Sequence, residues 1–195
     1  MPEVELPNPQ ELEEKKEKGF SKRVAMITAI FAVILAISSL GGSKAMKEML
    51  LFQQQASNQW AYYQAKVIRE QLYRSQKMLL EAGLIERAGS MKPEAREKIE
   101  AIIKKMADEE ARYNKEKKEV EQEARKLEKE RDLHRSKDPF FEFAEVLLQI
   151  AIVMASVSIL ATAPRIFYFS IGAAILGALF ALNGFFLIVR IPFFH

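Results

Sequence analysis

Three long apolar blocks, with a highly charged stretch between the first and the second, constrain the fold of this chain more than any other feature of its sequence. The blocks span residues 24–40, 143–163 and 166–189. Glu145, near the start of the second block, is the one charged residue in them. A helix that crosses the ~30 Å hydrocarbon layer of a membrane needs about 20 apolar residues at a rise of ~1.5 Å each. The pattern therefore predicts an all-α membrane protein with three transmembrane helices.

Between the first and second blocks, the charged stretch has helical apolar spacing and is broken only by a segment with glycine, serine and proline. It predicts two long extramembrane helices that fold back on each other as a coiled-coil-like antiparallel hairpin. The expected division of the chain is a flexible cytoplasmic tail (1–23), transmembrane helix 1 (24–42), the extramembrane hairpin (43–138, with helices 43–82 and 93–137 and a turn at 83–92), transmembrane helix 2 (139–163), and transmembrane helix 3 with a short tail (164–195).

A cleaved signal peptide is the alternative interpretation of the first block. A basic region precedes an apolar core there, and Ser39-Leu40-Gly41 has the small-x-small pattern of a cleavage site. We favour an uncleaved membrane anchor, because the region before the apolar core is longer than that of a typical signal peptide.

The first extramembrane helix has two apolar seams, and the second has one apolar position in each heptad. Matching apolar residues across the hairpin predicts a register in which Tyr63 lies opposite Tyr113 and Ala56 lies opposite Val120. The two seams of the first helix together are wider than one partner helix covers, which indicates a third contact, within the chain or from another copy. The second of these seams consists of Ala61, Ala65, Ile68, Leu72 and Leu79.

Aromatic residues gather on the extramembrane helices, ~30 Å beyond the expected membrane exit by helical rise, which is too far for an interfacial aromatic belt. Two explanations remain open for them: packing of Tyr63 on Tyr113 within the chain, or a contact face for a partner protein. The interaction candidates are Trp60, Tyr62, Tyr63 and Tyr113.

Small residues recur at helical spacing in all three apolar blocks, and such residues let membrane helices approach one another closely. The candidate packing residues are Ala25, Ala29, Ala32 and Ala36 in the first block, Ala151 and Ala155 in the second, and Ala173, Gly177, Ala181 and Gly184 in the third. Polar side chains inside these blocks are costly unless they are paired. We expect Gln149 and Asn183 to hydrogen-bond to each other, with Glu145 one turn from Gln149.

The residue composition argues against most chemical functions. The chain has no cysteine, and its two histidines, His134 and His195, have no acidic partner motif, so no metal site is predicted. No cofactor motif, catalytic constellation or small-molecule substrate is identified, and we expect the protein not to be an enzyme. The net charge of +3 and the close alternation of charge signs predict a solvated helix surface and no nucleic-acid partner.

Basic residues next to the apolar blocks predict the orientation in the membrane. Lys15, Lys16, Lys18, Lys22 and Arg23 precede the first block, and Arg165 lies between the last two. These charges favour a cytoplasmic N-terminus and a periplasmic hairpin over residues 43–138.

Residues 58–66 read Asn-Gln-Trp-Ala-Tyr-Tyr-Gln-Ala-Lys, and they follow a membrane anchor and precede a charged helix and a C-terminal membrane hairpin. In this string, and in the order of elements over nearly the whole chain, the protein resembles a bacterial family catalogued as domain of unknown function 4337. The resemblance implies a bacterial three-helix membrane protein and implies no activity.

These features favour a non-catalytic, multi-pass protein of a bacterial inner membrane. Its expected partners are the lipid bilayer and other protein. The periplasmic hairpin is expected either to mediate self-association as a homo-oligomer, or to bind a larger membrane protein complex as a scaffold or accessory subunit. The alternative is a component of an oligomeric pore or transporter, in which Glu145, Gln149 and Asn183 form the polar path.

Overall fold

The computed structural model describes residues 9–87 and 89–189. Over those residues the chain forms four helices and no strand: α1 (Pro9–Glu86), α2 (Pro93–Arg135), α3 (Asp138–Leu160) and α4 (Pro164–Phe186). The predicted all-α class is confirmed, and the three apolar blocks lie in helices that are long and apolar enough to cross a membrane.

Helix α1 is longer at both ends than predicted. It begins at Pro9, so residues 9–23 are helical where a flexible tail was expected, and it ends at Glu86, so the turn to α2 is shorter than residues 83–92. The helix also continues without a break through Gly41 and Gly42. A glycine costs a helix only about 1 kcal/mol relative to alanine, which neighbouring helical residues and packing offset.

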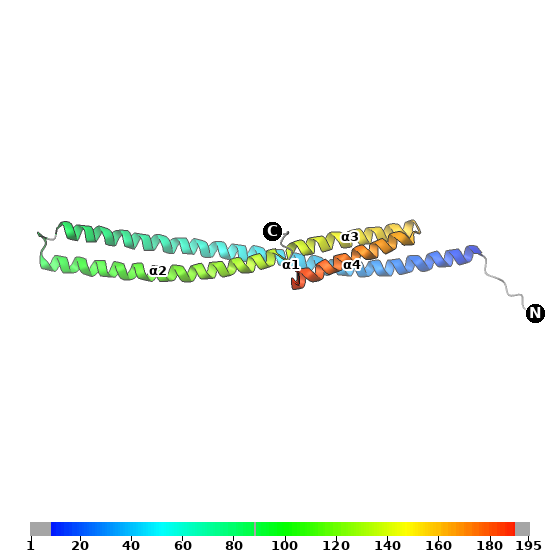
Figure 1. Cartoon of the computed structure of the whole chain (residues 1–195), viewed down its shortest axis with the longest axis horizontal. Helices are drawn as coiled ribbons and strands as arrows, with labels where there is room; N and C mark the ends of the chain where they lie inside the picture. The colour runs from blue at the N-terminus through cyan, green and yellow to red at the C-terminus, as the bar shows by residue number, and fades with distance from the viewer. Residues whose placement is uncertain (1–8, 88, 190–195) are drawn as a thin grey trace, which may run out of the picture. The chain divides into compact units, whose positions relative to one another are not determined.

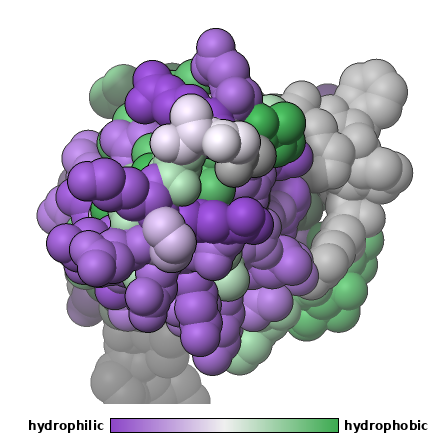
Figure 2. All heavy atoms as spheres, turned by 90° about the vertical axis from the view of Figure 1, so that its left-hand side faces the viewer, coloured by the Kyte–Doolittle hydropathy of each residue, from purple (hydrophilic) through white to green (hydrophobic). Residues whose placement is uncertain are grey.

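The helices form two compact units, which we call the apolar unit (residues 1–49 and 133–195) and the charged unit (residues 50–132). In the charged unit, α1 and α2 run antiparallel, because Lys77 of α1 contacts Glu110 of α2 whereas Gln53 contacts Arg131 (Figure 1). Viewed from the turn between the two helices, the near surface carries mostly hydrophilic side chains with scattered apolar ones (Figure 2).

In the apolar unit, α3 and α4 lie side by side and pack against the N-terminal part of α1 (Figure 1). Two clusters form its core. Phe31 of α1 meets Leu148 and Ala151 of α3 and Ala174 of α4 in the first cluster. Val24, Ala155 and Phe167 form the second.

The buried positions of α4 recur every three or four residues, which is the spacing of helices that pack at a small crossing angle. They are Phe167, Ser170, Ala174, Gly177, Ala181 and Gly184.

The connection from α3 to α4 is as tight as Pro164 predicts. Thr162 adopts a left-handed backbone with φ of 45°, which is unusual for a β-branched residue. The Ala163 N–H donates to the Ser158 carbonyl at 3.1 Å, which closes the last turn of α3. Pro164 then occupies the first turn of α4, where its missing N–H leaves no bond unmade.

Candidate functional site

The charged unit contains an ionic core between α1 and α2. Glu70 is 4% exposed, although it is a carboxylate on a long surface helix. It accepts hydrogen bonds from Lys117 Nζ at 2.5 Å and from Asn114 Nδ2 at 2.8 Å. Burial opposes ionisation of Glu70, but these two hydrogen bonds and the charges of Lys117 and Arg74 outweigh it and hold its pKa below the usual range.

One turn away, the buried Lys66 forms a second ion pair, with the half-buried Glu116. Hydrogen bonding to Glu116 and to the Tyr62 hydroxyl raises the pKa of Lys66, and the Lys66 hydrogen bond lowers the pKa of Glu116. The Lys66 ammonium also lies 4.9 Å from the Tyr62 ring centroid and 5.2 Å from that of Tyr113, both within cation–π range. The charged side chains at the centre of the interface, Glu70 and Lys66 of α1, are therefore each paired with an opposite charge on α2.

Tyr113 is the aromatic residue at the centre of this interface, and it is 6% exposed. Its ring stacks on Tyr73, with 5.6 Å between the centroids and an interplanar angle of 16°. The predicted register is therefore wrong: Tyr113 meets Tyr73 and not Tyr63, a shift of about 15 Å along α1 by helical rise. The prediction matched apolar residues alone, whereas the observed register also pairs Glu70, Lys66 and Lys77 with opposite charges on α2.

The remaining two aromatic candidates form their own contact. Trp60 and Tyr63 lie edge to face, with 5.4 Å between their ring centroids. The Trp60 indole N–H donates to Glu128 Oε1 at 3.0 Å, and the Arg125 guanidinium lies 5.8 Å from the indole ring. Trp60 is thus tied to α2 by polar contacts, whereas the Tyr62 side chain is exposed.

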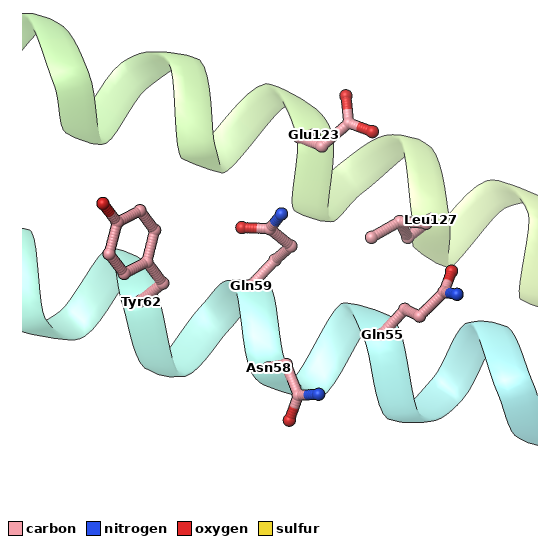
Figure 3. A pocket seen from close by; sticks show the side chains of 6 residues that line it. All are labelled: Gln55, Asn58, Gln59, Tyr62, Glu123 and Leu127. Atoms are coloured by element: carbon pink, nitrogen blue, oxygen red, sulfur yellow. The ribbon is translucent and has the colours of Figure 1, made fainter.

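A shallow groove of about 450 Å³ follows this contact along α1. Figure 3 shows Gln59 and Tyr62 directed from α1 towards α2, and Asn58 directed away from it. The lining is dominated by amides and consists of Gln55, Asn58, Gln59, Tyr62, Glu123 and Leu127. Such a lining offers neutral hydrogen-bonding groups and no cluster of charge for an ionic ligand.

The other side of α1 in the charged unit is apolar and uncovered. Ile68, Leu72 and Leu79 are 66%, 53% and 70% exposed, and Ala61 and Ala65 are exposed in line with them. These five residues are the second seam that the sequence predicts, and α2 does not cover it. We refer to them as the outer seam.

The small residues of α3 and α4 lie at close contacts. Ala151 and Ala155 are fully buried, and Gly177, Ala181 and Gly184 are also buried, while Ala173 is half-buried. A Cβ atom on Gly177 would lie 2.9 Å from Leu148 Cγ and 3.1 Å from the Ala144 carbonyl oxygen, so only glycine fits this crossing.

Phe141 of α3 occupies a space that three glycines provide. A Cβ atom on Gly41 or Gly42 of α1, or on Gly184 of α4, would lie 2.6, 3.1 and 3.0 Å from Phe141 side-chain atoms, respectively. Gly41 and Gly42 lie at the end of the segment expected as transmembrane helix 1 (24–42), and the apolar pattern of the sequence gives no sign of this packing role.

The alanine face of the first block is not buried. Ala25, Ala29, Ala32 and Ala36 are all exposed, so the prediction that this face packs is not met within the chain. The buried face of this block carries Val24, Phe31 and Ser38, which recur every seven residues. The larger side chains of Val24 and Phe31 fill the space between three helices better than methyl groups do.

Asn183 has a partner other than the predicted one. Its side-chain oxygen accepts from the Val189 N–H at 2.8 Å, and its Nδ2 donates to the Val189 carbonyl at 2.9 Å. Gln149 is exposed on α3, so the predicted Gln149–Asn183 bond is wrong. The reason is that Leu187 ends α4 in a left-handed conformation with φ of 47°, which turns the following backbone towards Asn183.

Among the described residues, no group of three or more acidic or histidine side chains is arranged to hold a metal ion. His134 has the acidic neighbour that the sequence did not indicate, since its Nδ1 lies 3.0 Å from Glu48 Oε2. His195 lies outside the described residues, and Glu145 is half-buried on α3.

Sequence reasoning missed Lys66, Glu70, Tyr73, Asn114, Glu116 and Lys117 as interface residues. The helical spacing of α1 could have indicated the residues of this helix. The face that carries Ala56 and Tyr63 continues, at steps of three and four residues, through Lys66, Glu70, Tyr73 and Lys77. Charged residues at such positions are usually assigned to solvent, and only their pairing across the helices shows otherwise.

A family model described as Domain of unknown function (DUF4337) matches residues 20–187 of the chain. A search of curated proteins found no match. A search of solved structures also found none.

Proposed function

The chain belongs to the Domain of unknown function (DUF4337) family, whose description assigns no activity, and from its geometry we propose a non-catalytic membrane protein whose helical hairpin binds other protein. The observation that carries this proposal is the outer seam of α1. Its apolar side chains stay exposed in a unit whose ionic groups already pair with one another. Exposed apolar stripes of this kind on a charged surface mark protein contacts.

We propose that the three apolar helical segments cross a bacterial inner membrane and that the charged unit lies outside the bilayer. The segments are long and apolar enough to span it. The basic residues before the first segment, with Arg165 between the last two, favour a cytoplasmic N-terminus and a periplasmic hairpin over residues 43–138. A phosphatase fusion after Gly89 is then active and a cytoplasm-dependent reporter at the same site is silent; the reverse pattern would overturn the orientation.

The binding role is tested on the intact protein in a mild detergent. We expect native mass measurement to give a particle larger than one chain with its detergent, either as copies of this protein or with a co-purified second protein. A monodisperse single chain at all concentrations and in all mild detergents would contradict the proposal.

An oligomeric pore or transporter component is the second candidate. Gln149 is exposed on α3 and Glu145, one turn before it, is half-buried, so both polar groups lie where another copy would be needed to shield them from lipid. Ion flux through proteoliposomes that depends on Glu145 and Gln149 would favour this function, and tight vesicles would favour the binding role.

A further inference from the structure

We propose that the outer seam of α1 pairs in parallel, and in register, with the same seam of a second copy of this chain. This inference rests on the proposed binding function and names the partner. Three features carry it: the spacing of the seam, the scarcity of charge beside it, and the equal number of residues that separates the seam from the membrane anchor in two copies.

The spacing of the outer seam is that of a helix pair. Ala61, Ala65, Ile68, Leu72 and Leu79 follow steps of four, three, four and seven residues, and Ser75 occupies the intermediate position. A seam with this 3.5-residue average matches a second helix over several turns. It lies opposite the face that binds α2, so a further helix can join without displacing α2.

The surroundings of the outer seam carry little charge, in contrast to the rest of the charged unit. Residues 50–65 of α1 contain no charged side chain. Further along, Lys66, Glu70 and Lys77 pair with groups of α2. The charge that flanks the seam directly is Arg69, and its guanidinium lies 5.8 Å from the Tyr113 ring on the side of α2.

This scarcity of charge favours a second copy as the occupant. Two identical helices in parallel bring one flank of the seam near the opposite flank of the partner, so two flanks that carried charges of one sign would oppose pairing. Here the flanks are mostly amides and apolar groups: Tyr62, Gln64, Gln71, Gln76 and Met78. The exposed face of α2, by contrast, is densely charged, with residues such as Lys104, Lys115 and Lys118.

The membrane anchors set the direction of the pair. The first apolar block and the outer seam belong to the same helix, α1, so copies that cross the bilayer with one orientation carry equivalent seam residues at the same number of residues from the anchor. Equivalent seam residues of two copies can therefore lie opposite one another in a parallel pair. Such a contact buries the apolar side chains that a single copy leaves in water.

Single-cysteine cross-linking tests the geometry, because the chain has no native cysteine. Ile68→Cys, Leu72→Cys and Leu79→Cys are each expected to form disulfide-linked dimers when membranes are oxidised, since the Cα atoms of equivalent residues approach within about 7 Å at all three positions only in a parallel, in-register pair. Lys104→Cys and Lys118→Cys on α2 are the matched controls and are expected to stay monomeric.

Three results would overturn the inference. If the seam variants stay uncross-linked while the native particle is larger than one chain, the partner contact lies elsewhere and the proposed function stands. If they cross-link to a protein of another mass, the seam binds a different partner. A particle of one chain throughout would contradict the proposed function as well.

A charge-complementation experiment separates a lost contact from lost folding. Leu72 is 53% exposed in the single chain, so Leu72→Glu is expected to keep the helical circular dichroism of the parent and to lose the dimer. Leu72→Lys is expected to do the same, and co-expression of the two variants is expected to restore dimers that contain one of each. Full dimerisation of Leu72→Glu alone would overturn the proposal.

Discussion

Glu70 of α1 and Lys117 of α2 form an ion pair across the helical interface, with Lys117 Nζ 2.5 Å from Glu70 Oε2, although Glu70 is almost fully buried. Asn114 supplies a second hydrogen bond to the same carboxylate. A buried ion pair contributes little net stability compared with an apolar pair, but removal of one partner leaves a buried charge unsatisfied. We therefore expect the pair to specify the register of the two helices more than it adds to their affinity.

Replacement of Lys117 tests this role. Lys117→Met is expected to lower the free energy of unfolding by about 1.5–3 kcal/mol, because it removes a hydrogen bond to a charged, buried group. Lys118→Met changes the neighbouring, exposed lysine and is expected to stay within about 0.5 kcal/mol of the parent. Thermal unfolding of the full chain in detergent, followed by circular dichroism, measures both. Equal losses in the two variants would contradict a specific role for Lys117.

The charged unit is expected to lose stability at both extremes of pH. Glu70 and Glu116 have pKa values below the ordinary 4.5, so the stability they contribute is complete above that value and is lost as the pH falls through their folded pKa. Lys66 has a pKa above the ordinary 10.5, so its contribution is complete below that value and is lost as the pH rises further.

A pair of variants distinguishes the two limbs of this profile. Glu70→Gln is expected to flatten the acid limb and to leave the alkaline limb unchanged, whereas Lys66→Met is expected to flatten the alkaline limb. Melting temperatures of the full chain between about pH 3 and about pH 11 record the profile, with the range chosen to span the ordinary carboxyl and amine values. An acid limb that is identical in the parent and in Glu70→Gln would exclude this carboxylate as its source.

The stacked pair of Tyr73 and Tyr113 distinguishes the observed register from the predicted one. In a double-mutant cycle, Tyr73→Ala and Tyr113→Ala are expected to show a coupling energy of about 0.5–1.5 kcal/mol, the range for aromatic pairs. Tyr63→Ala and Tyr113→Ala are expected to be additive within about 0.5 kcal/mol, because these residues do not form the pair. Coupling between Tyr63 and Tyr113 instead would restore the register predicted from apolar matching.

Gly177 is expected to be irreplaceable at the crossing of α3 and α4. Gly177→Val forces atoms against Leu148 and the Ala144 backbone, and overpacking of this kind costs about 1–3 kcal/mol. Gly172→Val is the matched control, since it places the same side chain on the same helix at a position with no atom within 4 Å. Thermal stability in detergent is expected to fall in the first variant only, and a similar fall in both would point to the helix propensity of valine.

The sequence by itself determined the helical class, the three apolar segments and the outer seam of α1. Hydropathy fixes the segments because burial or lipid must cover so many apolar residues, and the 3.5-residue repeat fixes which residues share a face. The outer seam, from Ala61 to Leu79, follows from the spacing of its apolar residues alone, and the fold leaves it uncovered on the face where that spacing places it.

Tertiary structure decided the register of α1 on α2 and the face that the first apolar block presents to α3 and α4. A heptad repeat satisfies its apolar pattern equally well after a slip of one heptad, so the register depends on which polar groups meet, and Glu70 finds Lys117 in only one register. The first block is apolar on all sides, so its pattern does not distinguish the alanine face from the face of Val24 and Phe31. Side-chain volume in the space between three helices makes that choice, and volume is a property of the packed neighbours, which no single helix contains.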